Sequence, residues 1–396
     1  MNASNTLEYP KNYVPGFTVG RGAYGIVFSA QRPSINPETG EADRDEAGNV
    51  IMEDVAIKKI EDYACVDRGT GTDFKTKYLR RICREVDILL HFRSVPQIVE
   101  TKEIYLSPDG RDLYIVMTFV PLSLDKLMRN PTIRDALSED HVRWISVQIL
   151  LGLSALHRAG CMHRDLSLGN ILFDPSTMDC FIADFGLSRV QFDVEQDISL
   201  DVVSLPYRAP EVLLQCGRYQ HTVDVWSIGC VLMELILKKP FLHAKDALWQ
   251  LIAIMKEISG FIDLDEWKDK ASTIAINYFT KMKTNNPDTL PSPKDVGQRV
   301  LDAGYSHDAA DVLRRMLVFH PDRRATVVEL LAMPWFQDDA HCKEAIQMAE
   351  QGEGLQPCPF AIESMQYNEL IEHMKSCCTP GVIPTECVSV GSQPPQ

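Results

Sequence analysis

Three oxygen-bearing side chains in the middle of the chain have the types and spacing that phosphoryl transfer requires. Asp165 and Asn170 lie in the stretch HRDLSLGN, and Asp184 opens the tripeptide DFG fourteen residues beyond Asn170. Phosphoryl transfer needs a carboxylate that orients the attacking hydroxyl and metal ions that neutralise the phosphates. Asp165 could orient the hydroxyl, while Asn170 and Asp184 offer the hard oxygen ligands that Mg²⁺ prefers. Alone, a DFG tripeptide is more often an ordinary turn.

A glycine-rich stretch near the N-terminus could hold the phosphates. Gly20, Gly22 and Gly25 precede Val27 in VGRGAYGIV. Backbone that carries no Cβ can approach a phosphate closely, and its N–H groups can surround the anion. The same glycines could form a plain hairpin turn. A dinucleotide-binding interpretation requires a helix after the glycines, whereas the alternation of apolar residues predicts a second strand.

A lysine inside an apolar strand is a second candidate for phosphate binding. Lys58 ends the stretch VAIK, and its ammonium group must either reach water or meet an anion. Glu85 lies just off the apolar face of a predicted helix over 79–90, so it could pair with Lys58 and aim it at the phosphates. Both residues could instead be a lone strand lysine and a solvated acid.

The elements that would carry these residues change type along the chain. Alternating apolar residues predict a hairpin over 17–32 and a strand over 55–60, with an exposed loop or extended hairpin between them. Helical periodicity follows, then two short strands near 98–105 and 113–119, and helical patterns dominate after that. Strands first and helices afterwards predict an α+β fold with a small sheet lobe and a large helical lobe.

The net charge and the cysteine pattern limit the classes of binding partner and the cellular compartment that we expect. The chain carries 55 acidic and 40 basic residues, a net charge of −15, which argues against nucleic acid or an anionic membrane as the main partner. The longest apolar run, 225–237, contains an acid and is too short to span a bilayer, so it predicts a buried helix. The 11 cysteines are irregularly spaced, and no Cys/His cluster has zinc-like spacing. We therefore expect a reduced, cytoplasmic protein, with the nucleus left open as a further location.

Taken in order, these motifs resemble those of the eukaryotic protein kinases. The glycine loop, VAIK, Glu85, HRD with Asn170, DFG and Ala209-Pro210-Glu211 follow that family's order and spacing. Within the family the resemblance is closest to the MAP kinases, through the stretches 78–93, 112–128, 224–235 and 316–336. It implies a bilobal protein kinase fold, a small β-rich N-lobe and a large helical C-lobe, with ATP and Mg²⁺ bound between the lobes.

The resemblance also implies a division of the chain. The expected parts are an N-terminal segment over 1–12, a kinase domain over 13–336 and a C-terminal extension over 337–378 that packs on the kinase core. Within the kinase domain, the N-lobe is expected over 13–117 and the C-lobe over 121–336. Residues 379–396 are rich in Pro, Ser and Gly, which predicts a disordered tail.

By resemblance, the expected catalytic residues are Asp165, Lys58, Glu85 and Asn170. The expected metal ligands are Asn170 and Asp184. The glycine loop, the VAIK strand and the hinge supply the expected ATP-binding residues: Gly20, Gly22, Gly25, Val27, Ala56, Lys58, Met117, Thr118 and Val120. Two supporting contacts are also implied, an ion pair between Arg324 and Glu211, and a hold of Asp224 on the backbone of the catalytic loop.

One departure from the family concerns catalysis itself. Ser167 stands where related kinases have a lysine that contacts the transferring phosphate. Loss of one such donor can cost roughly 10²–10³ in rate. The chain is therefore either a Ser/Thr protein kinase that transfers the ATP γ-phosphate to protein hydroxyls, or an ATP-binding pseudokinase that acts as a signalling scaffold. The intact Lys58, Asp165, Asn170 and Asp184 favour the enzyme.

A second departure lies in the activation segment over 184–211. MAP kinases carry a Thr-x-Tyr pair there, whereas this chain has Ser199-Leu200-Asp201, so dual phosphorylation is not expected. Ser199 alone could be phosphorylated. The arginines that match the positions around the family's phosphothreonine are Arg81, Arg84, Arg164 and Arg189. Alternatively these arginines serve ordinary ion pairs, or Asp201 occupies their pocket.

The substrate side has fewer markers. Ser204 matches a hydroxyl that Ser/Thr kinases keep near the catalytic Asp. Leu205 replaces an arginine that favours proline after the phosphorylated residue, so that preference is left open. Asp338 and Asp339 lie near the acidic patch with which MAP kinases bind basic docking peptides, although two acids are usually just solvated. The implied partners are protein substrates, an upstream kinase and docking peptides.

Overall fold

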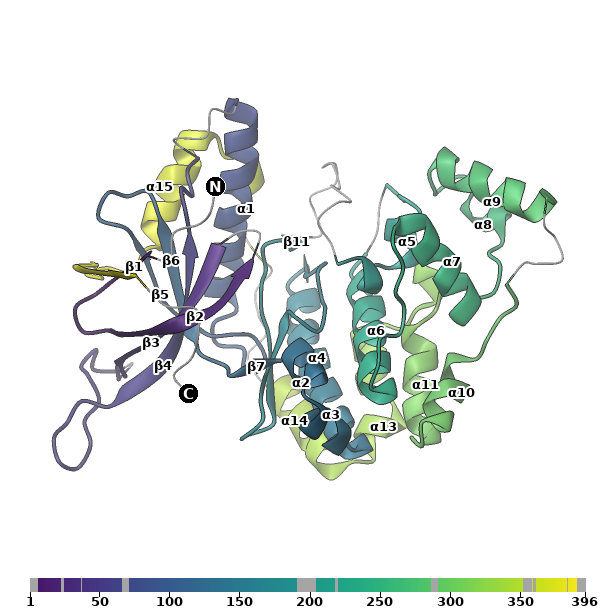
Figure 1. The fold of residues 1–396 in the computed structure, drawn as a ribbon, viewed down its shortest axis with the longest axis horizontal. Helices are drawn as coiled ribbons and strands as arrows, with labels where there is room; N and C mark the ends of the chain where they lie inside the picture. The colour runs from purple at the N-terminus through teal and green to yellow at the C-terminus, as the bar shows by residue number, and fades with distance from the viewer. Residues whose placement is uncertain are drawn as a thin grey trace. The chain divides into compact units, whose positions relative to one another are not determined.

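The computed structural model describes residues 6–22, 25–36, 38–65, 71–190, 204–217, 220–285, 291–351, 358, 361–382 and 384–389. The chain forms two compact units (Figure 1). Unit 1 combines Met1–Val120 with Pro359–Gln396, and unit 2 is Pro121–Cys358. Unit 1 is therefore built from both ends of the chain.

Unit 1 is rich in strands. Its elements are β1 (Thr6–Tyr9), β2 (Val14–Gly22), β3 (Gly25–Pro33), β4 (Met52–Ile60), α1 (Thr72–His91), β5 (Thr101–Leu106), β6 (Leu113–Thr118), the 3₁₀ turn η4 (Ala361–Ser364), α15 (Tyr367–Cys377) and β12 (Glu386–Ser389). Five strands form an antiparallel sheet in the order β2-β3-β4-β6-β5. The hairpin over 17–32, the strands and the helix that the sequence pattern predicts are all found here.

One face of this sheet packs into an apolar core. Phe28, Ile57 and Val116 lie opposite one another on β3, β4 and β6 and are fully buried. Leu7 of β1 and Tyr13 pack into the same cluster. Because side chains alternate along a strand, the residues between them point to the other face, where Val27, Ala56 and Lys58 are half-buried. The sheet therefore has one core face and one more accessible face.

The segment between β3 and β4 contains two short hairpin turns in succession. Ile35 bridges to Ala42 around the first turn, and Arg44 bridges to Val50 around the second. The sequence left a loop or an extended hairpin open for this Pro-, Gly- and acid-rich stretch, and the described part has these two local turns in place of one long hairpin.

The predicted disorder of the tail over 379–396 is wrong for part of that segment. β12 pairs with β1 in antiparallel register, and the Thr379 N–H donates to the Ile104 carbonyl at 2.7 Å. The Thr379 hydroxyl in turn accepts from the Ile104 N–H at 2.9 Å. Composition cannot reveal such pairing, since the backbone supplies the hydrogen bonds and distant strand edges supply their partners.

Unit 2 is mostly helical. Its helices are α2 (Leu124–Arg129), α3 (Pro131–Ala136), α4 (Glu139–Arg158), α5 (Pro210–Leu213), α6 (Thr222–Leu237), α7 (Ala247–Glu257), α8 (Leu264–Trp267), α9 (Thr273–Asn285), α10 (Val296–Asp302), α11 (His307–Met316), α12 (Val327–Leu331), α13 (Pro334–Gln337) and α14 (Ala340–Gln351). Its short strands and 3₁₀ turns are β7 (Leu122–Ser123), β8 (Cys161–Met162), β9 (Ile171–Asp174), β10 (Asp179–Ile182), β11 (Arg189–Val190), η1 (Leu205–Tyr207) and η3 (Pro321–Arg323). The predicted α+β class is confirmed.

Two helices of unit 2 position the loop that carries Asp165. α4 begins at its N-cap Ser138, whose side chain accepts from the His141 N–H, and the short strand β8 separates its last residue from the loop. α6 is buried along almost its whole length, as its apolar sequence predicts. Its one central acid, Glu234, is satisfied because it accepts from the Tyr207 hydroxyl at 3.1 Å and the Phe241 N–H at 3.2 Å. Among the described residues, no helix combines the length and the apolar character needed to cross a bilayer.

The packing of β1 gives a stability prediction. Leu7→Ala should lower the free energy of unfolding by about 2–5 kcal/mol, because Leu7 is fully buried in the core of the sheet. Val14→Ala is the control, since Val14 is 53% exposed and should change it by less than about 0.5 kcal/mol. Urea titrations followed by circular dichroism would measure both. Equal effects would contradict a structural role for β1.

Candidate active site

The accessible face of the sheet in unit 1 carries the expected nucleotide-binding residues. Val27 is paired with Lys58 across β3 and β4, and Ala56 is paired with Met117 across β4 and β6. Paired residues share a face, and residues two apart on a strand share a face, so all four point to the same side. Each is half-buried, in contrast to the fully buried residues that alternate with them. Thr118 follows on β6, and its N–H donates to the Glu100 carbonyl at 3.0 Å.

The glycines of the β2–β3 hairpin have two different roles. A Cβ on Gly25 would lie 2.1 Å from the Lys59 carbonyl oxygen, so only glycine fits against β4 at that position. A Cβ on Gly20 or Gly22 would meet no described atom within 4 Å. The backbone of these two glycines is therefore accessible, which suits close approach of a phosphate.

Two consecutive lysines of β4 point to opposite faces of the sheet. Lys58 Nζ lies 2.5 Å from Glu85 Oε1 on α1, which confirms the expected ion pair. Lys59, on the core side, pairs instead with Asp112 at 2.9 Å. Glu85 is almost fully buried, so the partner on β4 compensates a charge that would otherwise be costly to bury. The pair fixes the position of Lys58 on the accessible face.

In unit 2 the loop after β8 brings Asp165, Asn170 and Ser204 together. Asn170 Nδ2 donates to the Asp165 carbonyl at 2.8 Å and to the Asp165 carboxylate at 3.2 Å. The Ser204 N–H donates to the other carboxylate oxygen, also at 3.2 Å. The carboxylate of Asp165 is thus held from two sides. Asn170 bonds the backbone as well as the carboxylate of Asp165, so it also fixes the shape of the loop.

The electrostatics of Asp165 differ from those of a surface acid. Burial raises the pKa of its carboxyl, and the charge on Asp184 raises it further, against the opposing hydrogen bond from the Ser204 backbone and the charge of His163. Asp184 therefore lies close enough to Asp165 for the two carboxylates to interact. Asp184 has a backbone φ of +62°, a left-handed conformation that is uncommon for a residue with a side chain and that is often found at functional sites.

A fully buried acid on α6 holds the loop that carries Asp165. Asp224 Oδ1 accepts from the Arg164 N–H at 2.8 Å, and its Oδ2 accepts from the His163 N–H at 2.9 Å. His157 Nε2 lies 2.9 Å from the same Oδ2. Burial alone would raise the pKa of Asp224, but the hydrogen bond and charge of His157 and the loop contacts outweigh it and hold the pKa below its usual value. The expected hold of Asp224 on the loop backbone is confirmed.

The HRD and DFG segments are also joined directly. His163 Nε2 lies 3.1 Å from the Ala183 carbonyl oxygen, and its ring packs edge-on against the buried Phe185 ring at 5.0 Å. The Asn170 carbonyl accepts from the Ala183 N–H at 2.9 Å. These contacts place Asp184 relative to Asp165 within one rigid cluster.

Ser167, the residue that departs from the family, is buried in the loop. It is 7% exposed, and its carbonyl accepts from the Asn170 N–H at 3.1 Å. Its hydroxyl oxygen lies 3.6 Å from the position that a Cβ on Gly169 would take. The serine side chain stays close to the backbone of the loop. It has neither the length nor the charge of the lysine that related kinases have at this position.

A buried ion pair supports the segment after Ser204. Arg324 donates from Nη1 and Nη2 to the two carboxylate oxygens of Glu211, at 2.8 and 3.0 Å, and from Nη1 to the Thr222 carbonyl at 2.7 Å. Both side chains are almost fully buried. The expected pairing of Arg324 with Glu211 is confirmed.

Several sequence candidates remain predictions. Ser199 lies outside the described residues. Arg81 and Arg84 lie on α1 of unit 1, whereas Arg164 and Arg189 belong to unit 2, where they donate to the Leu187 and Ser188 carbonyls at 3.4 and 2.9 Å. Val120 ends unit 1 and is buried.

One supporting residue was missed from the sequence, and one predicted surface charge proves to be structural. His157, in the last turn of α4, orients Asp224, and no sequence motif marks it. Asp339 is not merely a solvated acid, since it accepts from the Cys342 N–H at 2.9 Å and pairs with Arg143 at 3.1 Å. Asp338 beside it is exposed.

The Glu211 pair gives a second stability prediction, with a matched control one residue away. Arg324→Ala should lower the free energy of unfolding by about 3–5 kcal/mol, because it leaves the Glu211 charge buried and uncompensated. Arg323→Ala breaks only the exposed contact with Glu266 and should cost about 0–1 kcal/mol. Denaturant titration of both variants tests the contrast, and a small loss in Arg324→Ala would refute it.

Comparison with known proteins agrees with this geometry. The family model "Protein kinase domain" matches residues 47–336. Mitogen-activated protein kinase 6 of Oryza sativa subsp. japonica is 33% identical over 376 residues, 94% of this chain and 87% of that protein. Mitogen-activated protein kinase 12 of Danio rerio is 33% identical over 383 residues, 91% of this chain and 94% of that protein. The chain therefore belongs to the eukaryotic protein kinase family, close to the MAP kinases.

Proposed function

We propose that this chain is a catalytically active Ser/Thr protein kinase, which transfers the γ-phosphoryl group of ATP to protein hydroxyls. The observation that carries the proposal is the Asp165 carboxylate, which the Asn170 side chain and the Ser204 backbone hold in place beside Asp184. A general base in phosphoryl transfer needs such a fixed carboxylate more than it needs strong basicity.

In this mechanism Asp165 accepts a hydrogen bond from the substrate hydroxyl and orients its oxygen for in-line attack. A bond forms between that oxygen and the γ-phosphorus, and the bond from the γ-phosphorus to the β–γ bridging oxygen breaks. The hydroxyl proton passes to Asp165, and ADP leaves with the electron pair. Ser204, whose N–H contacts the Asp165 carboxylate, suits a serine or threonine substrate by the family resemblance.

Unit 1 supplies the residues that bind ATP. The face with Val27, Ala56 and Met117 offers apolar contacts for the adenine ring, and the accessible backbone at Gly20 and Gly22 suits the phosphates. Lys58, fixed by Glu85, offers a cation for the α- and β-phosphates.

The donor set in unit 2 fits Mg²⁺. Asn170 and Asp184 offer oxygen ligands only, and the charge on Asp184 raises the pKa of Asp165, so the site carries a negative potential that a dication would offset. When bound, Mg²⁺ neutralises charge on the phosphates. Asn170 and Asp184 would hold it, while Asp165 remains the group that faces the substrate hydroxyl.

The serine at position 167 favours the alternative, a pseudokinase scaffold that binds ATP but does not transfer its phosphate. A lysine at this position stabilises the transferring phosphoryl group, and loss of one such donor costs roughly 10²–10³ in rate. The missing lysine lowers the expected rate, but Lys58, Asp165, Asn170 and Asp184 are still present. We therefore propose a slow enzyme rather than an inactive one.

Transfer of phosphate from labelled ATP tests this proposal. With Mg²⁺, the wild type should label generic Ser/Thr protein substrates or itself, and Asp184→Ala should abolish the signal, because it removes a proposed metal ligand. Asp174→Asn is the control, since Asp174 ends β9 and its carboxylate accepts hydrogen bonds from the N–H and the hydroxyl of Ser176, in the turn that follows. It should transfer phosphate as the wild type does. Ser167→Lys should raise the rate by about tenfold or more.

Each other outcome has a definite meaning. Signal that persists in Asp184→Ala would come from a co-purified kinase and would remove the support for an enzyme. A silent wild type that binds ATP, together with an active Ser167→Lys, would establish the pseudokinase.

We further propose that an upstream kinase phosphorylates Ser199. Ser199→Ala should lower kcat/KM by about tenfold or more, because one charged hydrogen bond to an arginine is worth about 1.5–3 kcal/mol. Phosphatase treatment should reduce the wild type to the level of Ser199→Ala and leave that variant unchanged. Equal kinetics for the two proteins, before and after phosphatase, would refute regulation at this residue.

A further inference from the structure

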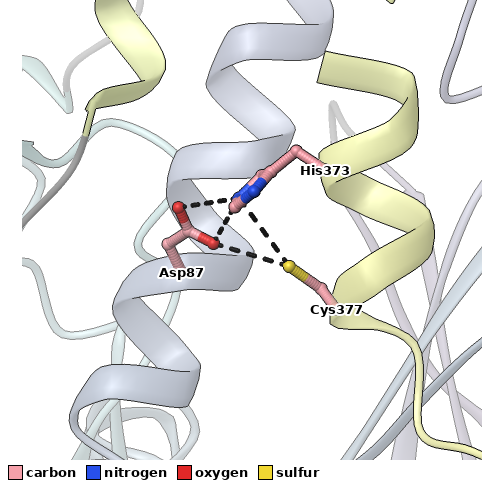
Figure 2. A group of neighbouring side chains, drawn as sticks. All are labelled: Asp87, His373 and Cys377. Carbon is pink, nitrogen blue, oxygen red and sulfur yellow. Dashed lines mark hydrogen bonds and ion pairs between the residues drawn. The ribbon is translucent and has the colours of Figure 1, made fainter. Parts of the chain in front are cut away.

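Three side chains of different chemistry meet where α15 packs on α1 within unit 1. Asp87 projects from α1 toward His373 and Cys377, which lie one helical turn apart on α15 (Figure 2). His373 Nε2 lies 2.8 and 3.0 Å from the two Asp87 carboxylate oxygens. Cys377 Sγ lies 3.6 Å from Asp87 Oδ1 and 3.7 Å from His373 Nε2. The three ligating atoms thus converge on one point.

These separations are close to those of ligands around a single zinc ion. With Zn–S, Zn–N and Zn–O bonds of about 2.3, 2.0–2.1 and 2.0 Å at tetrahedral angles, sulfur lies about 3.5–3.6 Å from either other ligand atom. The two sulfur distances in this cluster are already of that size. The imidazole and carboxylate would have to separate by only about 0.3–0.5 Å, to the ~3.3 Å expected between nitrogen and oxygen ligands.

We propose that Asp87, His373 and Cys377 form a binding site for a divalent transition metal, with Zn²⁺ as the preferred ion. One carboxylate oxygen, one imidazole nitrogen and one thiolate are a ligand set that zinc accepts. A hard, oxygen-preferring ion such as Mg²⁺ would not use the sulfur. Three protein ligands leave the fourth position to water, and the cluster is reachable from solvent, since His373 is 25% exposed and Asp87 is 11% exposed.

The protons balance without any further reactant. In the metal-free protein, burial raises the pKa of the Cys377 thiol to about 12, so the thiol is protonated at neutral pH. Binding of the ion replaces the thiol proton by a sulfur–metal bond and frees the imidazole nitrogen from its hydrogen bond with Asp87. Each ion bound releases the thiol proton to solvent, and the proton between His373 Nε2 and Asp87 moves to Nδ1 or leaves for solvent.

The site would fasten the C-terminal segment to α1. The two helices run in the same direction, since Arg80 donates to the carbonyl of Met365, just before α15, at 3.0 Å, and Asp87, seven residues further along α1, meets His373. A metal would add a coordinate link to this contact. Asp87 lies two residues after Glu85, about 200° around the helix, so one side of α1 faces Lys58 and the other faces the proposed ion.

Metal retention by the full chain, with any affinity tag removed, tests the site directly. After incubation with Zn²⁺ and desalting, the wild type should hold about one zinc per chain by elemental analysis. Cys377→Ser, His373→Gln and Asp87→Asn should each raise the dissociation constant for zinc by about tenfold or more. Cys378→Ser is the matched control. Its thiol contacts the Met374 carbonyl at 3.5 Å and lies outside the cluster, so this variant should bind zinc as the wild type does.

Two measurements on the wild type test the proposed site even if a variant fails to fold. Co²⁺ should give the near-ultraviolet absorption of a thiolate ligand, and bound Zn²⁺ should protect Cys377 but not Cys378 from alkylation, as mapped by mass spectrometry. A wild type that retains no zinc, or zinc that protects neither cysteine, would overturn the proposal and leave a hydrogen-bonded triad. None of these readouts depends on phosphoryl transfer, so the site stands or falls apart from the proposed activity.

Discussion

Asp224 accepts hydrogen bonds from two consecutive backbone amides of the loop that carries Asp165, and the geometry of unit 2 depends on that contact. The carboxylate is completely buried, so it is compatible with the fold only while the loop and His157 satisfy it. The loop is constrained in return, because Arg164 adopts a left-handed φ of +72° that an unsupported chain would avoid. His163 and Asn170 of the same loop in turn contact the backbone of Ala183, so the DFG segment is also held in place.

In unit 1, two ion pairs lie on opposite faces of the sheet. Its sheet separates two consecutive lysines, and each meets its own acid, Glu85 for Lys58 and Asp112 for Lys59. The alternation of a strand produces this separation without any special turn. Lys59 therefore forms part of the core side of the sheet, while Lys58 stays on the face that we propose as the nucleotide-binding face.

Sequence patterns predicted the parts of this kinase that are local. The glycines, VAIK, HRD and DFG mark short segments with strong constraints, and the strands and helices that carry them follow from apolar periodicity. Contacts between distant segments had no such signal. The strand β12 pairs with β1 through backbone groups, which composition does not encode. Asp87 and His373 are 286 residues apart, so no spacing rule for metal ligands could join them.

The closure of unit 1 by the last segment of the chain has a consequence for biosynthesis. Domains generally fold as they leave the ribosome, the N-terminal ones first. Here the first 120 residues emerge before all of unit 2, yet β12 and α15 emerge after it. Until residues 367–389 have been made, β1 lacks its pairing partner and one side of α1 is uncovered. Synthesis that stops between unit 2 and α15 would therefore leave unit 1 incomplete, although its glycine loop and its VAIK strand had already been made.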